Sequence, residues 1–347
     1  MSGTRGVAIV GAGDMGAKHA LHWAATGAEI RAVYDPEAQR AQALAARTGA
    51  RVADSAETAL QTPGVEVASI CTPTSLHAPL TIAALEAGRD VLCEKPVALT
   101  LADAEAMAAA ERRAGRRLRI GFMRRFDPLW RRVEAFRDEL ADPLLAQATL
   151  AAGVRPKTLM HDARVNGGPV IDMACHLFDR WERLFGGPPL EVAAHGHTFG
   201  ADRAELATVA HKALDTVQVT LRYPRGGVGQ FQLSWGLPRG VPHHERHTYL
   251  APGGMIEVDG ATATWITGDG PLRWGPGHED PWGLQIQAFA RELDGAGPQG
   301  LADVEDGIRA LRASLAVLAA AASGRPVAPD APDLDAATAP AAAGGTP

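Results

Sequence analysis

The first 121 residues repeat one pattern, in which a short apolar run is followed by an Ala-rich amphipathic stretch. The apolar runs are typical of strands and cover Val7–Val10, Glu29–Tyr34, Val67–Thr72, Asp90–Cys93 and Leu118–Gly121. The stretches between them are typical of helices and cover Met15–Ala25, Glu37–Arg47, Leu76–Ala87 and Leu101–Ala114. A glycine follows each helix, as at many helix C-termini. This alternation predicts a doubly wound parallel sheet with helices on both faces.

After about residue 125 the pattern changes to consecutive strands. The strand-like runs are Leu190–His195, Thr216–Tyr223, Val228–Ser234, Glu245–Leu250, Met255–Val258 and Ala263–Thr267. Turn residues lie between them at Pro224–Gly227 and Pro252–Gly254, which favours an antiparallel sheet. Helices are predicted over Leu129–Leu140, from near Asp172 to Gly186, over Leu284–Leu293 and over Val304–Ala322.

Length and composition set the domain organisation. A chain of 347 residues is long enough for two domains. We expect an N-terminal α/β domain over residues 1–123 and a C-terminal α/β domain with a large, mostly antiparallel open sheet over residues 124–328. Residues 329–347 are Ala, Pro, Asp and Gly with almost no large apolar side chain, which predicts a disordered tail.

Charge and cysteine content exclude several classes of protein. The formal charge of −6 argues against binding to nucleic acid, which needs a basic face. The three cysteines, Cys71, Cys93 and Cys175, cannot pair evenly and form no CxxC, so a disulfide scaffold and a thiolate zinc site are not expected. We find no signal-peptide pattern and no apolar run long enough to span a bilayer. The expectation is a soluble cytoplasmic protein without membrane contacts.

A glycine motif follows the first strand and opens the first helix. It reads Gly11-Ala12-Gly13-Asp14-Met15-Gly16. In a dinucleotide site the first glycine permits the turn, the second lets the pyrophosphate approach the backbone, and the third lets helix and strand pack closely. The free N–H groups of the helix N-terminus then face the phosphates. Asp35, about twenty residues further on, can accept hydrogen bonds from ribose hydroxyls and repels a 2′-phosphate, so NAD is expected rather than NADP.

Several further segments resemble the Gfo/Idh/MocA oxidoreductases, the family of glucose–fructose oxidoreductase and inositol dehydrogenase. After the glycine motif comes His19. The other segments, in the order of the family, are Cys71-Thr72-Pro73-Thr74 with His77, Glu94-Lys95-Pro96, the run Gly121–Pro128, Gly167-Gly168 before Asp172–His176, Asp303–Arg312, and Gly324-Arg325-Pro326. The resemblance covers nearly all of residues 5–328. The run Gly121–Pro128 is most similar to the inositol 2-dehydrogenase branch.

The resemblance implies a fold and an assembly. The family combines a Rossmann domain with an α/β domain whose large sheet is mostly antiparallel, which agrees with the pattern read above. Family members associate through the open face of that sheet, which we expect to be apolar. The resemblance therefore implies a homodimer or a homotetramer, with a small-molecule polyol or sugar as the other partner.

Asp172 and His176 are candidates for acid–base catalysis. They are four residues apart, so on one helix they would share a face, either as a carboxylate that orients an imidazole or as an ordinary surface pair. The resemblance assigns His176 as the acid/base and Asp172 as its orienter and substrate anchor. It assigns Lys95 as a catalytic residue that polarises the substrate oxygen and contacts the cofactor, and it implies a cis bond before Pro96. Leu177 departs from the family, in which many members carry an acid at this place.

Other candidate residues lie after predicted strands. Thr72, Pro73 and His77 follow the fourth strand and are expected near a cofactor ribose, although His77 would also suit a helix start. Glu94 and Arg124 are further cofactor candidates, and the roles of four polar residues stay open: Arg125, His161, Asp162 and Arg164. No metal site is expected, because the spacing in His243–His247 does not fit the HExxH zinc motif.

These features favour an NAD-dependent oxidation of a secondary hydroxyl on a cyclic polyol or sugar to a ketone, with the proton taken by His176. One alternative is a sugar or sugar-derivative dehydrogenase of the same family. Another is an NAD-using glycoside hydrolase, in which the cofactor oxidises and re-reduces the sugar within one cycle. A non-catalytic ligand sensor is disfavoured by the complete set of Lys95, Asp172 and His176.

Overall fold

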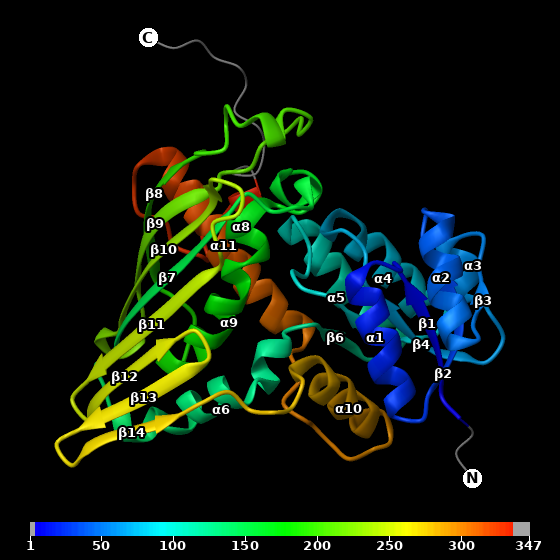
Figure 1. The fold of residues 1–347 in the computed structure, drawn as a ribbon, viewed down its shortest axis with the longest axis horizontal. Helices are drawn as coiled ribbons and strands as arrows, with labels where there is room; N and C mark the ends of the chain where they lie inside the picture. Colours follow the sequence, from blue (N-terminus) through cyan, green and yellow to red (C-terminus); the bar gives the residue numbers. More distant parts are fainter. Residues whose placement is uncertain (1–3, 336–347) are drawn as a thin grey trace. The chain divides into compact units, whose positions relative to one another are not determined.

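The computed structural model describes residues 4–335, and these divide into two compact units (Figure 1). The first unit contains the residues up to Ala98, Ala102–Pro128 and His278–Ile308. The second contains Leu99–Leu101, Leu129–Gly277 and the residues from Arg309 on. The segment 278–308 therefore packs in the first unit, far along the chain from the other residues of that unit.

The first unit is built on a six-stranded parallel sheet. Its strands are β1 (Gly6–Val10), β2 (Glu29–Tyr34), β3 (Arg51–Val52), β4 (Val65–Ile70), β5 (Asp90–Cys93) and β6 (Leu118–Ile120). Their order is β3-β2-β1-β4-β5-β6, which confirms the predicted doubly wound Rossmann sheet. The order reverses between β1 and β4, and ligands of such sheets bind at this point, beyond the carboxyl ends of the strands. The two-residue strand β3 was not predicted.

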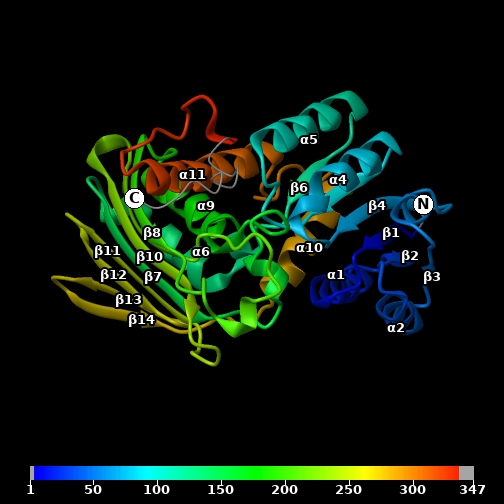
Figure 2. The same ribbon diagram turned by 90° about the horizontal axis from the view of Figure 1, so that it is seen from above.

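Helices cover both faces of this sheet (Figure 2). They are α1 (Asp14–Ala25), α2 (Ala38–Thr48), α3 (Ala56–Leu60), α4 (His77–Glu86), α5 (Leu101–Ala114) and α10 (Pro281–Leu293), with the short 3-10 helices η1 (Thr74–Leu76) and η2 (Met123–Phe126). On the face of α1 and α2, Trp23 packs edge-on against Phe289 of α10. This apolar contact explains why α10 belongs to the first unit.

The second unit contains an eight-stranded sheet. Its strands are β7 (Leu145–Gly153), β8 (Glu191–His197), β9 (Thr216–Arg222), β10 (Val228–Leu237), β11 (His244–Ala251), β12 (Gly254–Asp259), β13 (Thr262–Thr267) and β14 (Gly270–Trp274). The order is β14-β13-β12-β11-β7-β10-β9-β8, and only the pair β7–β10 is parallel among these neighbours. The predicted large, mostly antiparallel sheet is thus confirmed, although β7 and β14 were not predicted.

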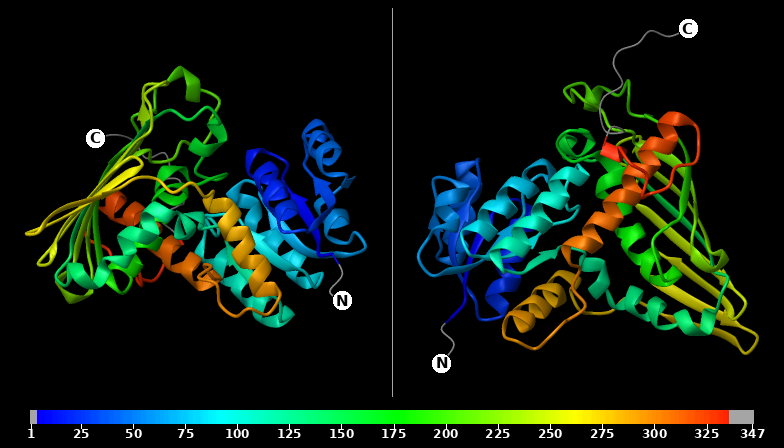
Figure 3. Two further views of the ribbon diagram at one scale, coloured as in Figure 1. Left: turned by 60° about the horizontal axis from the view of Figure 1, so that its bottom comes forward. Right: turned by 180° about the vertical axis from the view of Figure 1, so that it is seen from behind.

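Helices of the second unit lie on one face of this sheet (Figure 3). They are α6 (Pro128–Ala135), α7 (Arg137–Leu140), α8 (Gly168–Asp172), α9 (Ala174–Phe185) and α11 (Val304–Ser323), with the 3-10 helices η3 (Thr158–His161), η4 (Ala204–Leu206) and η5 (Pro224–Gly226). α11 begins in the first unit and continues into the second at Arg309. Trp181 and Phe178 of α9 pack edge-on against Phe231 of β10, so aromatic contacts hold this helix on the sheet.

Two helices expected to be continuous are interrupted. The helix predicted over Leu129–Leu140 is divided at Phe136 into α6 and α7. The helix predicted from near Asp172 to Gly186 corresponds to α9, and a one-residue interruption at Met173 separates it from α8, which ends at Asp172. At this interruption the N–H of His176 bonds to the carbonyl of Met173, a three-residue spacing, at 3.3 Å.

The segment after α11 is ordered as far as the structure describes it. Leu334 is buried, and the carboxylate of Asp335 accepts a hydrogen bond from the N–H of Leu101 at 2.7 Å. Leu334 and Asp335 of the expected disordered tail therefore pack against the second unit, and residues 336–347 lie outside the described residues. Among residues 4–335, none of the helices combines the length and the apolar character of a membrane span.

Candidate functional site

The glycine motif around the β1–α1 loop contains three glycines, and the protein requires glycine at only two of these positions. Gly11 has a φ of +95°, and a Cβ there would lie 2.5 Å from the Cys71 carbonyl oxygen. A Cβ on Gly16 would lie 1.8 Å from the Gly11 carbonyl oxygen. A Cβ on Gly13 would meet nothing within 4 Å. The protein itself therefore requires Gly11 and Gly16, whereas Gly13 leaves open space at the end of the helix.

This open space suits the pyrophosphate of a dinucleotide. Gly13 is the N-cap of α1, and no side chain caps its first turn, in which Asp14 and Met15 are the first residues. The N–H groups of a helix N-terminus attract an anion through hydrogen bonds and the helix dipole. The residues present thus fit the pyrophosphate of a dinucleotide cofactor.

Asp35, directly after β2, lies against the same loop. Its Oδ2 accepts a hydrogen bond from the N–H of Ala12 at 2.7 Å, and its Oδ1 accepts one from Glu37 at 2.8 Å. A carboxylate has about four acceptor positions, so each oxygen can accept one more hydrogen bond. Asp35 is therefore fixed beside the glycine loop with acceptor capacity for ribose hydroxyls.

Replacing Asp35 with serine is expected to raise the ratio of the kcat/KM for NADP to that for NAD by about tenfold or more. The serine hydroxyl keeps an acceptor for Ala12 but removes the negative charge that repels a 2′-phosphate. Steady-state kinetics with both cofactors measures this ratio. Glu37→Ser removes a charge two residues away and is the matched control. An Asp35→Ser ratio equal to that of this control would contradict the role of Asp35.

His77, the first residue of α4, is buried and connects two loops. Its Nδ1 lies 2.7 Å from the Pro96 carbonyl oxygen, and its Nε2 lies 3.0 Å from the Thr72 carbonyl oxygen. Burial lowers the pKa of His77, although these two carbonyls favour its charged form. A neutral ring donates to only one of the two carbonyls. Both ring nitrogens of His77 face the protein, so the expected contact of this residue with a cofactor stays a prediction. Pro73, between Thr72 and η1, is exposed.

Glu94 follows β5 and is also turned into the protein. Its Oε1 lies 2.9 Å from Nε2 of His19, and its Oε2 accepts a hydrogen bond from the Lys95 N–H at 3.2 Å. Burial would raise the pKa of Glu94, but the hydrogen bond with His19 and the charges of His19, Lys95 and His77 outweigh it and hold the pKa below its ordinary value. Glu94 is therefore a buried carboxylate with protein partners on both oxygens.

Glu94→Gln is expected to make the stability of the protein less sensitive to acid. Because the folded-state pKa of Glu94 is lowered, its contribution is complete above the unfolded pKa, near 4.3, and is lost as pH falls through the folded value. At pH 7 the amide cannot accept from both His19 and Lys95, which costs about 1–3 kcal/mol.

Thermal unfolding between pH 3 and pH 7 measures this effect. The melting temperatures of the wild type and of Glu94→Gln should converge as the pH falls. Glu66→Gln, on the exposed side of β4, should follow the wild type throughout. A constant difference between wild type and Glu94→Gln over the whole range would contradict the lowered pKa.

Lys95 is half-buried and lies beyond the carboxyl end of β5. The cis bond between Lys95 and Pro96 that the resemblance implied is present. β5 pairs with β4, and β4 pairs with β1, so the residues after all three strands lie at one edge of the sheet. The first unit thus brings Gly13, Thr72 and Lys95 to the edge where doubly wound sheets bind ligands.

The arginines of η2 differ in their surroundings. Arg125 forms an ion pair with Asp306 of α11, with Nη2 and Oδ2 3.0 Å apart and both side chains partly buried. This contact lies within the first unit and gives Arg125 a structural partner. Arg124 is half-buried, and its expected contact with the cofactor stays a prediction.

Asp172 and His176 lie in the second unit, at the interruption between α8 and α9. Gly167 and Gly168, both with positive φ, lead into α8. Asp172 is 5% exposed and His176 is 6% exposed, which is not the burial of an ordinary surface pair. The thiol of the buried Cys175 donates a hydrogen bond to the Asp172 carbonyl, with Sγ and O 3.1 Å apart, and so stabilises this turn. The two candidates lie on either side of a one-residue interruption at Met173, whose backbone stays in the helical region, and their expected interaction stays a prediction.

The loop before α8 is fixed by main-chain contacts. The N–H of Arg155 donates to Nε2 of His161 at 3.0 Å, and the carbonyl of His161 accepts from the N–H of Ala213 at 2.8 Å. The Asp162 carboxylate accepts from the N–H of Arg164 at 2.8 Å. No spacing in the sequence predicts the contacts of His161, because only the fold brings its two loops together. No group of metal-ligating side chains occurs among the described residues.

Comparisons with known proteins agree with the fold of both units. Residues 5–122 match the GFO/IDH/MocA oxidoreductase family, NAD-binding Rossmann fold, and residues 137–265 match the GFO/IDH/MocA C-terminal domain. The chain is 30% identical to scyllo-inositol 2-dehydrogenase (NAD(+)) of Bacillus subtilis over 259 residues, 72% of each protein. It is 41% identical to an inositol 2-dehydrogenase of Streptomyces avermitilis over 155 residues, 43% of this chain, and so spans less than half the length of that relative, 45%.

Solved structures share the fold. An oxidoreductase of Agrobacterium radiobacter in complex with NAD+, L-tartaric acid and magnesium superposes with a TM-score of 0.82. The match covers 94% of this chain and 98% of that chain, at 18% sequence identity. At this identity the similarity shows the arrangement of secondary structure and nothing about substrate.

Proposed function

Because the chain belongs to the GFO/IDH/MocA family of oxidoreductases, we propose that it oxidises a secondary hydroxyl of a cyclic polyol or sugar to a ketone, with NAD as the hydride acceptor. The observation that carries this proposal is the open space at Gly13, at the uncapped N-terminus of α1 and beside the carboxylate of Asp35. The names of the two inositol dehydrogenase relatives support the substrate class.

The protein residues handle the proton and the substrate oxygen. NAD, when bound, supplies the carbon that accepts the hydride. An imidazole nitrogen of His176 takes the hydroxyl proton, because a carbonyl product requires that proton to leave. The Asp172 carboxylate orients the imidazole and stabilises its charged form. The Lys95 ammonium donates a hydrogen bond to the substrate oxygen and favours its deprotonation.

The choice of NAD over NADP rests on Asp35. A carboxylate at the end of β2 accepts from ribose hydroxyls and repels a 2′-phosphate. The Bacillus subtilis relative is named for its use of NAD(+), which supports the same choice.

The direct test is the formation of NADH, measured by near-ultraviolet absorbance. The protein is mixed with NAD, or separately with NADP, and a panel of inositols, hexoses, pentoses and sugar acids. We expect a rise with NAD and one cyclic polyol or sugar group, and none with His176→Ala. NAD binding without NADH formation, together with cleavage of a nitrophenyl glycoside, would replace the dehydrogenase with the NAD-using glycoside hydrolase. Absence of NAD binding would overturn the proposal entirely.

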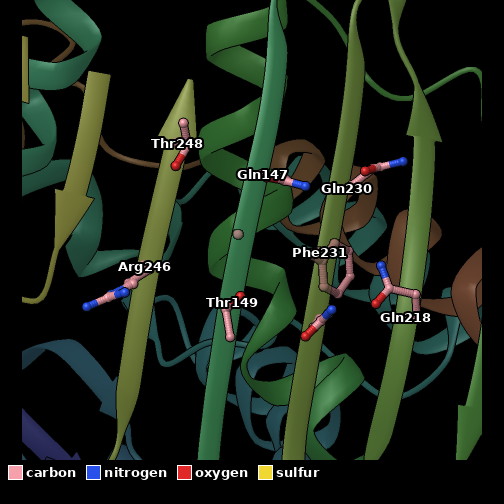
Figure 4. Close-up of a pocket in the computed structure, with 9 residues that line it drawn as sticks. Gln147, Thr149, Gln218, Gln230, Phe231, Arg246 and Thr248 are labelled. Atoms are coloured by element: carbon pink, nitrogen blue, oxygen red, sulfur yellow. The ribbon is translucent and has the colours of Figure 1, made fainter. Parts of the chain in front are cut away.

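We propose also that the protein associates as a homodimer or homotetramer through the outer face of the second sheet. This face combines polar side chains at the centre of the sheet with exposed apolar ones, among them the paired Leu145 and Leu250. Nine residues line a hollow of about 230 Å³ on this face (Figure 4), and most of them are polar, among them Gln147, Thr149, Gln218, Gln230, Arg246 and Thr248. Such side chains pair well with a second copy, because each amide both donates and accepts. A monomeric mass in light scattering would exclude this assembly.

A further inference from the structure

Three buried polar side chains of the first unit form a chain of hydrogen bonds beneath the candidate cofactor site. His19 comes from α1, Ser69 from β4, and Glu94 from the residue after β5. Nδ1 of His19 lies 2.8 Å from Oγ of Ser69, and its Nε2 lies 2.9 Å from Oε1 of Glu94. His19 and Ser69 have no exposed surface, and Glu94 is 6% exposed. The sequence placed His19 in the family pattern without giving it a role.

The direction of each hydrogen bond follows from the neighbours. The indole N–H of Trp23 can only donate, and it donates to Oγ of Ser69 at 3.1 Å. The Ser69 hydroxyl hydrogen can then point to Nδ1 of His19. An ionised Glu94 accepts from the other side of the ring, so Nε2 of His19 carries a proton. The His19 ring therefore bonds Ser69 with one nitrogen and Glu94 with the other at the same time.

The combination of serine, histidine and glutamate is known from hydrolases, but its position excludes that chemistry. A nucleophile must reach a substrate carbonyl, whereas Oγ of Ser69 lies inside the unit with Trp23 bonded to it. The chain of hydrogen bonds ends instead at the peptide group of Lys95, whose N–H donates to the second oxygen of Glu94.

We propose that His19 is a positioning residue for Lys95 and acts through Glu94. His19 holds one carboxylate oxygen of Glu94, and Glu94 holds the N–H of Lys95 with the other. On the far side of Lys95, His77 contacts the carbonyl of Pro96 at 2.7 Å. Two buried histidines, from α1 and α4, thus fix the main chain on both sides of Lys95. The inference rests on the proposed function, which assigns Lys95 to the substrate oxygen.

Loss of the His19 side chain should lower kcat, because catalysis is sensitive to the position of a group such as Lys95. A misplacement of a catalytic group by about 1 Å can lower the rate by about 100-fold. Without the His19 side chain, Glu94 loses the donor on Oε1 and is free to rotate, so the main chain at Lys95 is no longer held. The pyrophosphate is expected at Gly13, away from this change, and Lys95 contributes only one cofactor contact, so kcat should fall much more than the KM for NAD rises.

The kinetic experiment compares His19→Leu with His19→Gln in the full chain. The leucine variant removes both hydrogen bonds, and we expect kcat to fall about 10- to 100-fold with the KM for NAD changed less than threefold. A glutamine amide can donate to Glu94 with one end and accept from Ser69 with the other, so we expect His19→Gln to recover most of kcat. Equal kcat values for the leucine variant and the wild type would overturn the proposal.

A second, milder pair of variants tests the proposal even if His19→Leu does not fold. Ser69→Ala removes the hydroxyl that orients the ring, and Thr62→Val removes a buried hydroxyl elsewhere in the unit, which bonds only to the Thr58 carbonyl in the described contacts. The proposal predicts a several-fold lower kcat for Ser69→Ala and a wild-type kcat for Thr62→Val. Equal values for these two variants would attribute the effect to general destabilisation and overturn the proposal.

A measurement that does not depend on enzymatic activity can test the positioning role separately from the proposed function. The chain has only four lysines, Lys18, Lys95, Lys157 and Lys212. After reductive methylation with ¹³C-formaldehyde, NMR resolves each dimethyl-lysine, and Lys95→Arg identifies the Lys95 signal. We expect the Lys95 signal to move toward the position of an exposed lysine in His19→Leu but not in Thr62→Val. An unmoved signal would overturn the positioning role, whereas a moved signal with no dehydrogenase activity in the wild type would overturn only the proposed function.

Discussion

Replacing His176 with alanine is expected to lower kcat by about 100-fold or more while the binding of NAD is unchanged. His176 is the residue to which we assign the hydroxyl proton, and alanine has no group that can accept it. His176 lies at the start of α9 in the second unit, whereas the glycine loop lies in the first unit. Stopped-flow or steady-state NADH formation measures the loss, and calorimetric titration with NAD measures the binding.

A matched control is available for the loss of a buried imidazole. His247 on β11 is 2% exposed, and its ring packs edge-on against Trp130. His247→Ala should lower stability but keep kcat within a few-fold of the wild type. If His176→Ala keeps near-normal turnover, His176 has no part in proton transfer and the proposed mechanism fails.

Gly13→Ala is expected to weaken NAD binding by about 10- to 100-fold without lowering the melting temperature. The added methyl group meets no protein atom within 4 Å, and Gly13 has φ −72° and ψ −165°, which an L-residue adopts without strain. The methyl group would occupy the space of the pyrophosphate, and overpacking of this kind costs about 1–3 kcal/mol, or about one to two factors of ten in affinity.

The neighbouring glycine gives the opposite result and so serves as the comparison. A Cβ on Gly16 would lie 1.8 Å from the Gly11 carbonyl oxygen, so Gly16→Ala should lower the melting temperature by several degrees. NAD titration and thermal unfolding of both variants distinguish the two cases. Wild-type affinity in Gly13→Ala would show that the pyrophosphate does not lie at this loop.

All strands of the first sheet except the short, exposed β3 could be predicted, because burial in a parallel sheet produces apolar runs. The bounds of β2 and β5 agree with the sequence prediction. β7, the strand between β10 and β11, was not predicted, because its buried residues do not form a typical strand pattern. Its inward residues are Ala146, Ala148, Leu150 and Ala152, and alanine favours helices over strands. Only the hydrogen bonds to both neighbouring strands make this segment extended.

The interruption at Met173 shows a second limit of local patterns. Apolar residues recur at helical spacing from before Asp172 to Phe185, so the sequence indicates one continuous helix. The structure instead forms a three-residue hydrogen bond at His176 and a contact from Cys175 to the Asp172 carbonyl. Such a change of hydrogen-bond partner alters no side-chain periodicity and leaves no signal in sequence.

The sequence by itself determined the glycine loop, the carboxylate of Asp35 and the positions of Lys95, Asp172 and His176, because each depends on residues close together in the chain or on a family motif. Only the tertiary structure decided which side chains surround these residues.

Glu94, which holds the N–H of Lys95, is separated from its partner His19 by 75 residues, and the pKa of Glu94 depends on that partner. The difference has one physical reason: periodicity reports which side chains leave water, whereas the partner of a buried polar group is fixed only when distant elements pack together.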